Sequence, residues 1–480
     1  MFSFNVGKEH GVTESELARL NGPVRKAYDH LNHLMASLEE RLDLDLEWAV
    51  LPYQAGKTID KIQQLGNEIA AKFENVLSLG IGGSYLGLKA AQDALCPPYY
   101  NEFKNLRHGR PKIYFEGNNL DPAPLKVLLK NLDPKKTCCI VISKSGETAE
   151  TKAAFDVVAD WLKKGVGRAY GRRIFAITDL ISGSLRKRVN EEQRKDPLSF
   201  RNLPLLPGVG GRYSELNMGL LHLAVIGVDI NEVLAGARAM SRRCNLSSLY
   251  KNPALLYATL HYIAYKAKGK SIAVMMPFSE SLKSTADWYC QLLAESLGKK
   301  YARKIVVKEG KIEEWLADKK RVVHVGRTPV PSRGTTDLHS IQQNNVEGEN
   351  NKTVTMIRVE NFSQDLKVPA GSGLLSGKSF SRLLALAQEA TAWALVKAQR
   401  PNCTVVMPVL SPFLWGELLY FFEMATAFEG ELLGVNAYNQ PGVESYKNYM
   451  QVKLHKPGMS SAVAQEIKSH PVKKYQRFVL

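Results

Sequence analysis

A glycine-rich segment near the start of the chain has the composition of an anion-binding loop. It covers residues 79–87, follows an expected strand, opens a helix and contains Gly83 and Ser84. Glycines let backbone amides approach a ligand, and a helix start presents unpaired N–H groups with partial positive charge, which suits phosphate. Tyr85 replaces the last glycine of the dinucleotide fingerprint, and Leu88 replaces the lysine of the P-loop, so nucleotide binding is disfavoured. Taken alone, the segment could equally be a tight turn without a ligand.

A second segment, residues 143–151, combines hydroxyl groups with a positive charge. It also follows an expected strand and opens a helix, which we expect over 149–162. Its candidate phosphate-binding side chains are Ser143, Lys144, Ser145, Thr148 and Thr151. One hydroxyl is enough to cap a helix, so four hydroxyls and a lysine favour a phosphomonoester site over capping alone.

An arginine and a glutamate could supply the charges for a proton-transfer reaction. Arg212 projects from the glycine-rich segment 207–214, and its guanidinium would offer a permanent positive charge to a developing oxyanion. Glu295 lies on an expected helix over 282–297, beside an apolar stripe. A carboxylate partly withdrawn from water is suited to act as a general base. The simpler alternatives are a surface arginine and an exposed glutamate paired with Lys299.

Three further candidates lie in the second half of the chain. His339 belongs to an irregular stretch over 326–351, and imidazole can donate and accept protons near neutrality. Gln440 and Lys447 flank a proline–glycine turn and would point to one place if a helix starts near Val443. Without that context, the histidine could be structural and the lysine an ordinary surface residue.

The other metal-binding side chains do not predict a metal site. His30 and His33 share a helix face but have no third ligand nearby in the sequence. The six cysteines are scattered without a C-x-x-C pair, which predicts reduced, mostly buried thiols rather than disulfides or zinc ligands.

The elements that must position these residues follow a βα alternation. Short apolar runs bounded by turn residues alternate with longer amphipathic segments, which predicts an α/β fold with mostly parallel sheets covered by helices. The expected strands are 76–79, 113–115, 138–142 and 174–177, then 272–276, 305–307, 322–325, 354–359 and 404–407. Helices are expected over 14–42, 231–240 and 253–267. The mainly helical stretch 216–267 should carry the junction between two similar strand–helix sets.

Length and composition describe a globular chain with more than one core. The chain has 480 residues, of which 45% are hydrophobic and 23% charged, and this composition argues against a disordered protein. No run approaches the ~20 apolar residues of a membrane-spanning helix, so we expect no membrane partner. The first ten residues have no secretory pattern, which favours a cytoplasmic protein.

The net charge of +17 attracts anions without identifying them. Part of the basic surplus lies in three separate clusters, at 104–112, 186–188 and 468–477. These clusters lack the arginine–aromatic interleaving of a nucleic-acid surface. We therefore expect them to be solvated surface, and we expect no nucleic-acid partner.

Taken together, the six candidate segments resemble the glucose-6-phosphate isomerase (phosphoglucose isomerase) family. The most specific matches are Gly-Val-Gly-Gly-Arg-Tyr-Ser at 208–214 and the block from Gly430 through Asn-Gln-Pro-Gly-Val-Glu at 439–444 to Lys447. Their order and approximate spacing agree from about Val76 to Lys447. The resemblance implies two sugar-isomerase (SIS-type) domains, each a mostly parallel sheet flanked by helices, with a C-terminal helical arm. The expected parts are an N-terminal helical segment over 1–60, the two domains over 61–240 and 241–435, and a C-terminal helix and tail over 436–480.

The resemblance also implies a role for each candidate residue and a reaction. The implied roles are phosphate binding for Gly83, Ser84 and the hydroxyls and lysine of 143–151, oxyanion stabilisation for Arg212, general base for Glu295, ring opening for His339, and completion of the site by Gln440 and Lys447. The reaction is the interconversion of glucose 6-phosphate and fructose 6-phosphate through ring opening and a cis-enediolate. The implied enzyme is a homodimer with its sites at the subunit interface and without a metal or organic cofactor.

Two alternative functions remain open, and one residue departs from the pattern of the family. A relative could isomerise mannose or amino-sugar phosphates, or bind a sugar phosphate without turnover. The joint presence of Glu295, His339 and Lys447 argues against a binding protein, because binding alone needs none of them. Glu147 occupies a position where family members commonly carry a small hydroxyl residue. An inward side chain there would weaken phosphate binding, whereas an outward one would change nothing.

Overall fold

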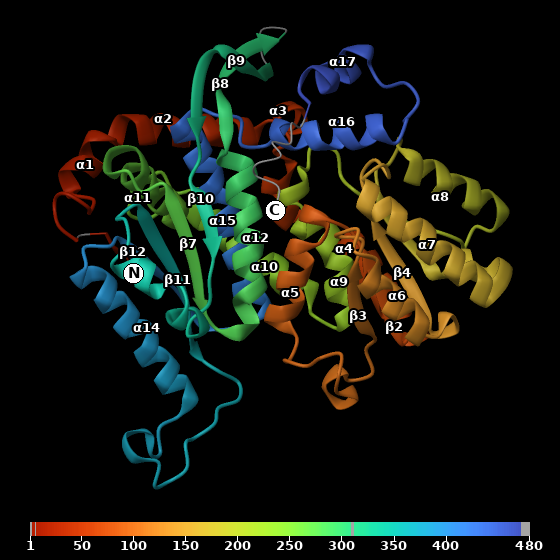
Figure 1. Ribbon diagram of the computed structural model, residues 1–480, viewed down its shortest axis with the longest axis horizontal. Helices are drawn as coiled ribbons and strands as arrows, with labels where there is room; N and C mark the ends of the chain where they lie inside the picture. The colour runs from red at the N-terminus through yellow and green to blue at the C-terminus, as the bar shows by residue number, and fades with distance from the viewer. Residues whose placement is uncertain (1, 5, 309–311, 472–480) are drawn as a thin grey trace, which may run out of the picture. The chain divides into compact units, whose positions relative to one another are not determined.

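The computed structural model describes residues 2–4, 6–308 and 312–471, and the chain divides into two units (Figure 1). The larger unit ends at Ala437 and the smaller one begins at Tyr438. The strands are β1 (Phe2–Ser3), β2 (Asn75–Leu79), β3 (Lys112–Glu116), β4 (Thr137–Ile142), β5 (Ile174–Thr178), β6 (Arg201–Pro204), β7 (Ile272–Phe278), β8 (Lys299–Lys308), β9 (Ile312–Val325), β10 (Thr328–Pro331), β11 (Lys352–Asn361) and β12 (Asn402–Val409).

The helices connect and cover these strands. The α-helices of the larger unit are α1 (Glu14–Arg19), α2 (Asn21–Ala36), α3 (Leu38–Asp43), α4 (Gly56–Lys72), α5 (Leu86–Leu95), α6 (Pro122–Asn131), α7 (Ala149–Val166), α8 (Ser184–Lys195), α9 (Glu215–Ile226), α10 (Ile230–Cys244), α11 (Pro253–Lys268), α12 (Lys283–Leu297), α13 (Gln342–Val346), α14 (Phe380–Lys397) and α15 (Pro412–Leu433). The smaller unit contains α16 (Glu444–Lys453) and α17 (Ser461–Ser469). Among the described residues, none of the helices combines the length and apolar character needed to cross a bilayer.

The first sheet has the strand order β3–β2–β4–β5–β6, and every neighbouring pair is parallel. β2, β4 and β5 are buried along their whole length, as expected for a parallel sheet covered on both faces. Leu77 and Val141 pack with Phe155 of α7, whereas the hydroxyl of Ser78 lies 2.7 Å from Nε2 of His222 on α9. The four strands predicted in the first half are confirmed, and the edge strand β6 lies outside the predictions.

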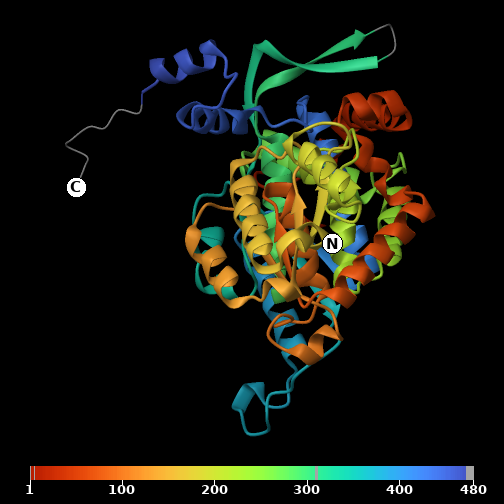
Figure 2. The ribbon, with the colours of Figure 1, turned by 90° about the vertical axis from the view of Figure 1, so that its right-hand side faces the viewer.

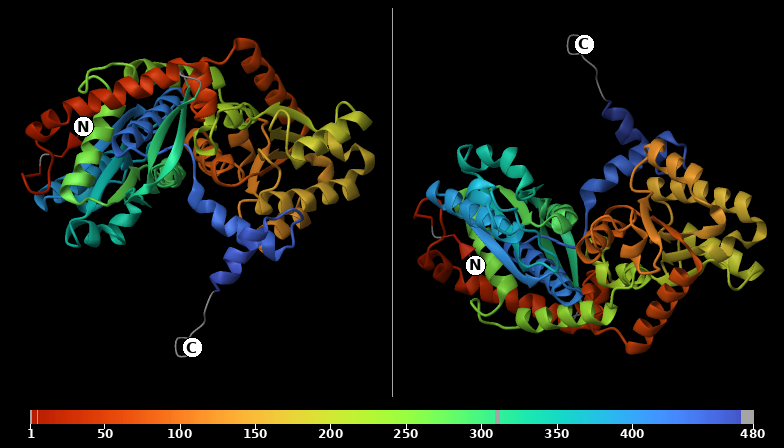
Figure 3. Two further views of the ribbon diagram at one scale, coloured as in Figure 1. Left: turned by 90° about the horizontal axis from the view of Figure 1, so that it is seen from above. Right: turned by 90° about the horizontal axis from the view of Figure 1, so that it is seen from below.

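The second sheet has the order β1–β12–β11–β7–β10 and is parallel except for β1, which pairs antiparallel with β12. Val354 and Met356 pack with Leu395 of α14, whereas the hydroxyl of Thr355 lies 2.8 Å from the Tyr257 hydroxyl of α11. The two sheets occupy opposite halves of the larger unit (Figure 3). The strands predicted at 272–276, 354–359 and 404–407 are confirmed, which confirms the α/β class.

One part of the sheet prediction is wrong. Residues 305–307 and 322–325 are strands, but they form an antiparallel hairpin of β8 and β9 instead of joining the parallel sheet. Only residues 309–311 separate these strands in the sequence, whereas a parallel pair needs a crossover of a dozen or more residues. Several of their apolar side chains stay exposed, among them Val307 at 58% and Val322 at 55%. Figure 2 shows the hairpin lying above the N-terminal helices, where the Glu313 N–H donates to the Glu40 carboxylate of α3 at 3.0 Å.

The helical predictions hold with one refinement. The segment 14–42 is helical but breaks into α1, α2 and α3. The break between α1 and α2 falls at Leu20, and α3 begins after Ser37, whose hydroxyl accepts a bond from the Glu40 N–H at 3.3 Å. The predicted helices at 231–240 and 253–267 are confirmed as α10 and α11. α10 and α15 cross closely, since a Cβ at Gly236 would lie 1.8 Å from the Phe413 carbonyl oxygen.

Candidate active site

The glycine loop after β2 packs directly against the loop that carries the arginine. It forms a short 3-10 turn, Gly82–Ser84, before α5 begins. A Cβ at Gly83 would lie 1.7 Å from the carbonyl oxygen of Gly211, so only glycine permits this contact. Gly83 is buried and Ser84 is half-buried. The contact brings the glycine loop and Arg212 to the same place.

The hydroxyl loop follows β4, the neighbour of β2, so both loops lie at the carboxyl edge of the first sheet. The hydroxyl oxygen of Ser143 accepts a bond from the Gly146 N–H at 3.0 Å, and that of Ser145 accepts from the Glu147 N–H at 3.1 Å. Each hydroxyl that accepts a bond in this way keeps its own proton to donate to a phosphate oxygen. Lys144 is exposed, and Thr148 is half-buried at the N-cap of α7.

One residue of this loop points elsewhere. Thr151 is 2% exposed, and its hydroxyl donates to the Gly117 carbonyl at 3.2 Å, so its single proton is already used. The structure therefore does not present Thr151 to a phosphate in the way that it presents the exposed Ser145. Glu147, like Lys144 and Ser145 in the same loop, is exposed.

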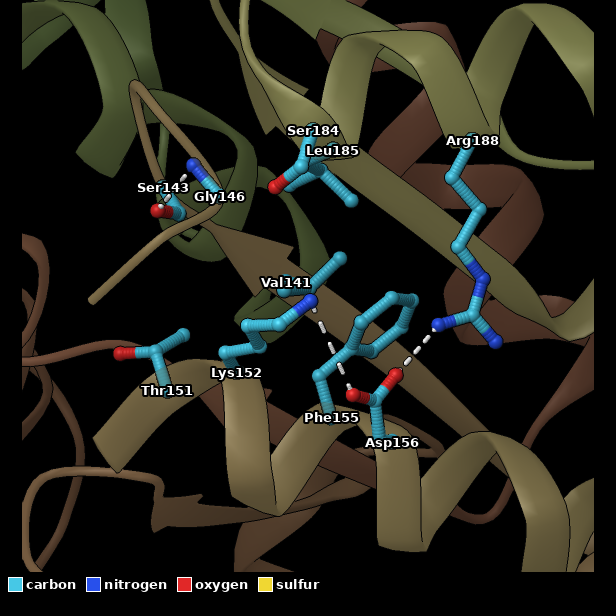
Figure 4. Close-up of a pocket in the computed structure, with 10 residues that line it drawn as sticks. All are labelled: Val141, Ser143, Gly146, Thr151, Lys152, Phe155, Asp156, Ser184, Leu185 and Arg188. Carbon is cyan, nitrogen blue, oxygen red and sulfur yellow. Dashed lines mark hydrogen bonds and ion pairs between the residues drawn. The ribbon is translucent and has the colours of Figure 1, made fainter. Parts of the chain in front are cut away.

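A pocket of about 40 Å³ lies behind the hydroxyl loop, between α7 and α8 (Figure 4). Its two cations, Arg188 and Lys152, both pair with Asp156, at 2.6 and 4.0 Å, and Arg188 lies 4.7 Å from the centre of the Phe155 ring. The pocket supports the loop, since Ser143 and Gly146 line it. The neighbouring Arg186 is 6% exposed and donates to the Asp179 carbonyl at 2.7 Å. The prediction that the basic cluster 186–188 is solvated surface is thus wrong for Arg186.

Arg212 is a buried residue, so the alternative of a surface arginine is wrong. It lies in the 3-10 turn Gly211–Tyr213 and is 2% exposed. Its guanidinium donates from Nε to Ser296 Oγ at 2.7 Å and from Nη2 to the Ala437 carbonyl at 2.5 Å. The Tyr213 ring, which stacks on Trp48 at 4.8 Å, holds the turn in place. These contacts fix the guanidinium in one orientation.

Glu295 faces Arg212 from the last turn of α12. Its Oε2 lies 3.5 Å from Arg212 Nη1, and its side chain is 28% exposed, so the carboxylate is partly withdrawn from water. Gln291, one turn earlier on α12, donates to Glu295 Oε1 at 3.3 Å. Lys299 donates to the main-chain carbonyl of Glu295, which is a different contact from the side-chain pair considered above. The structure therefore places a carboxylate and a fixed guanidinium side by side.

Two neighbours of this pair lie outside the sequence-based candidates. The Gln291 amide also contacts the glycine loop, since its Nε2 lies 2.9 Å from the position of a Cβ at Gly82. Its place at i−4 from Glu295 is a signal in the sequence that it shares that helix face. Asp45 is half-buried, and burial raises the pKa of its carboxyl while the positive charges of Lys144 and Arg212 oppose the shift. Asp45 thus lies within electrostatic range of both the hydroxyl loop and the arginine.

His339 lies at the other end of α12 from Glu295. It is exposed, in the 3-10 turn Thr336–His339 that follows β10. Gly326, just before β10, would place a Cβ 2.7 Å from Gly298 at the end of α12. Arg333, just after β10, pairs with Glu280 just before the start of α12. The distance from Lys283 to Glu295 along the helix is about 18 Å, so one chain does not bring His339 to Glu295.

Gln440 and Lys447 belong to the smaller unit. Gln440 is exposed and precedes the 3-10 turn Pro441–Val443. Lys447 lies on α16, which begins at Glu444 as the sequence predicts, and its ammonium pairs with the Glu444 carboxylate at 2.8 Å. Among the residues that the structure describes, no cluster of three histidine, cysteine or acidic side chains could hold a metal ion.

Several known proteins are similar to this chain over most of its length. A glucose-6-phosphate isomerase of Carboxydothermus hydrogenoformans is 40% identical over 93% of this chain and 92% of its own length. One of Symbiobacterium thermophilum is 35% identical over 87% of this chain and 88% of its own length. The crystal structure of a hypothetical protein from Thermus thermophilus is 31% identical, with a TM-score of 0.79 over 95% of this chain and 99% of that one. A glucose-6-phosphate isomerase structure from Chlamydia trachomatis, at 22% identity, shares the fold with a TM-score of 0.76 over 96% of this chain and 90% of that one.

A family model supports the same grouping independently of any single relative. The model described as phosphoglucose isomerase matches residues 57–470. The match includes both loops, the arginine turn, α12 and the block that ends at Lys447. The chain belongs to the phosphoglucose isomerase family.

Proposed function

We propose that this protein interconverts glucose 6-phosphate and fructose 6-phosphate. The observation that carries the proposal is the pairing of the Glu295 carboxylate with the buried guanidinium of Arg212, next to the glycine loop. Moving a carbonyl between C1 and C2 requires a base that removes a carbon-bound proton and a cation that stabilises the resulting enediolate. Glu295 would take and return the proton. Arg212 would stabilise the developing negative charge.

The phosphate is assigned to the two loops at the carboxyl edge of the first sheet. Ser84, the exposed Lys144 and Ser145, and the half-buried Thr148 would bind its oxygens, and Ser143 would support the loop. Binding of the phosphate, which is distant from C1 and C2, holds these carbons next to Glu295. The binding energy is thereby used to orient the substrate for proton transfer.

The remaining candidates would open the sugar ring, and the placement of His339 supports a homodimer. His339 and Lys447 would move protons to and from the ring and hydroxyl oxygens. Because His339 and Glu295 lie at opposite ends of α12, His339 of the partner subunit would complete each site. We assign the two sugar-isomerase domains to 61–240 and 241–435, an assignment that rests on one parallel sheet in each range, with the helical segment 1–60 before them and the helix and tail 436–480 after them.

We place this reaction in glycolysis and gluconeogenesis, in the cytoplasm. All six cysteines lie in the described part of the chain and are unpaired there, and five of them are buried. Unpaired thiols suit a reducing compartment.

The test is an isomerisation assay with deuterium exchange. Purified protein should convert glucose 6-phosphate to fructose 6-phosphate, and solvent deuterium should enter C1 or C2 of the sugar. Mannose 6-phosphate and glucosamine 6-phosphate, assayed in parallel, should react much more slowly. Preferred turnover of either would assign a related isomerase. Binding of all three without turnover or exchange would contradict the proposal and indicate a binding protein.

A further inference from the structure

Lys299 is a buried lysine at the point where α12 gives way to the β8–β9 hairpin. It is 7% exposed, which is unusual for an ammonium-bearing side chain. Its Nζ donates to the main-chain carbonyl of Glu295. Burying an ammonium has a considerable free-energy cost unless it gains strong polar contacts. The burial of the Lys299 ammonium therefore needs a structural or functional explanation.

The helix end explains part of this arrangement. The last backbone bond of α12 runs from the Gly298 N–H to the Ala294 carbonyl at 2.9 Å. The next carbonyl, that of Glu295, accepts from the Lys299 ammonium instead. A cation at a helix C-terminus is also favoured by the helix dipole. A lysine that served only as a cap could do so from the surface, however, where its charge would remain hydrated.

The electrostatic surroundings connect Lys299 to the proposed site. The charged groups that face its ammonium are the Glu295 carboxylate on α12 and the Arg212 guanidinium on the 3-10 turn Gly211–Tyr213. Burial and the nearby Arg212 charge lower the pKa of Lys299 to about 7, and the Glu295 carboxylate opposes that shift. Ser296, fully buried in the same turn of α12, accepts from Arg212 Nε.

We propose that Lys299 is a positioning residue, an inference that rests on the proposed isomerase function. Its ammonium holds the last turn of α12, so that Glu295 and Ser296 stay aligned with Arg212. A hydrogen bond from a charged donor is roughly twice as strong as one from a neutral donor. Loss of the Lys299 proton should therefore loosen this turn and lower the rate of proton transfer. The phosphate loops, which lie on other elements, should bind substrate as before.

The first test is Lys299→Met, which keeps the length of the stem but removes the charge and the donor. We expect kcat to fall by roughly 10- to 100-fold, because a charged hydrogen bond of this kind is lost, while KM for fructose 6-phosphate stays within about twofold. The matched control is Lys300→Met, the next residue on β8, which is exposed and should retain wild-type kcat. Equal kcat values in the two variants would overturn the proposal.

A pH profile separates positioning from a merely structural role and does not depend on the folding of the Met variant. In the wild type, kcat should decline as the pH rises through about 7, where Lys299 loses its proton. In Lys299→Arg the guanidinium stays charged, so the alkaline decline should move upward by more than one pH unit. An unchanged alkaline decline in an active Arg variant would refute the role of the charge. A wild type inactive on both sugar phosphates would instead refute the proposed function itself.

Discussion

Arg212 carries a permanent positive charge at a position that is 2% exposed. A buried charge is tolerated only when it is paired and hydrogen-bonded, and its nitrogens bind Ser296, the Ala437 carbonyl and the carboxylate of Glu295. These partners fix the guanidinium before substrate arrives. A donor fixed in this way stabilises a developing enediolate without having to reorient. Glu295, by contrast, keeps 28% of its side chain exposed, so it remains reachable by a substrate carbon.

Glu295→Gln tests the general base at the residue scale. The amide keeps the shape of the side chain but cannot accept a proton, so we expect kcat to fall roughly 10²- to 10⁴-fold with KM nearly unchanged. Steady-state assays in both directions measure the effect. The exposed Glu39→Gln is the control and should match the wild type. Activity of Glu295→Gln within a few-fold of the wild type would assign the base elsewhere.

Helix crossings set the geometry at the scale of elements. At the crossing of α10 and α15, a Cβ at Gly236 would lie 1.8 Å from the Phe413 carbonyl oxygen, and one at Gly416 would lie 1.9 Å from that of Val233. Neither position has space for a methyl group, so the two helices must separate to accept one. α15 also packs against α11 and α12, so its displacement would reach the helix that carries Glu295.

Gly236→Ala should therefore destabilise the protein. We expect a loss of about 1–3 kcal/mol in the free energy of unfolding, because overpacking outweighs the better helix propensity of alanine. Gly22→Ala is the matched control, since Gly22 lies in α2 with nothing within 4 Å of its added Cβ. That variant should be as stable as the wild type or slightly more stable. Thermal melts of the two variants side by side measure the difference, and equal melting temperatures would contradict the packing argument.

A pair of buried carboxyls joins α9 and α15 behind the arginine turn. Glu215 is 4% exposed, Glu423 is 2% exposed, and the Trp288 indole of α12 donates to Glu215 Oε1 at 2.9 Å. Burial raises the pKa of Glu215 to about 7, and burial with the adjacent Glu215 raises the pKa of Glu423 well above its ordinary value. The folded protein therefore holds protons that the unfolded chain releases at lower pH.

The sign of this linkage predicts how stability depends on pH. The contribution of the pair is fully present below about pH 4.5, the ordinary pKa of a glutamate, and is lost as the pH rises through about 7. Glu423→Gln keeps a hydrogen-bonding side chain without a titrating proton, so its stability should decline less between pH 5 and 8. The exposed Glu232→Gln should follow the wild type. Denaturant titrations across this range measure the free energies, and parallel curves for Glu423→Gln and the wild type would contradict the coupling.

At the scale of the whole molecule, the proposed homodimer follows from the length of α12. The helix separates Glu295 from the loop of His339, so each site would combine Glu295 of one chain with His339 of the partner subunit. Symmetric dimers form such shared sites twice, once on each side of the axis. Neither chain alone would then possess a complete site.

Mixing two inactive variants tests the shared site. Glu295→Gln and His339→Ala should each be nearly inactive, but refolding them together should restore about one quarter of the wild-type activity, because half of the dimers carry one intact site. Each variant refolded alone is the control. Mixtures without restored activity, formed under conditions where dimers exchange subunits, would place both residues in the same chain. Light scattering at assay concentration should give twice the mass of the chain.

Local sequence patterns were sufficient to predict the two loops and the strands that precede them. The runs at 76–79 and 138–142 predict buried strands, and the glycines and hydroxyls that follow them predict the two loops, because turn chemistry and apolar periodicity depend on neighbouring residues. The predicted start of a helix near Val443 is likewise confirmed at Glu444. These features can be predicted from the sequence without knowledge of the fold.

Which side chains meet depends on how the chain folds. It buried Arg212 against Ser296, turned the Thr151 hydroxyl towards Gly117, and placed Lys299 beneath Glu295. It also made 305–307 part of a hairpin instead of a sheet strand. Most of these contacts join residues that are distant in the sequence. The contact between Lys299 and Glu295 is local, but it depends on where α12 ends. Side-chain burial and pairing depend on such contacts, which periodicity and residue type along the chain do not encode.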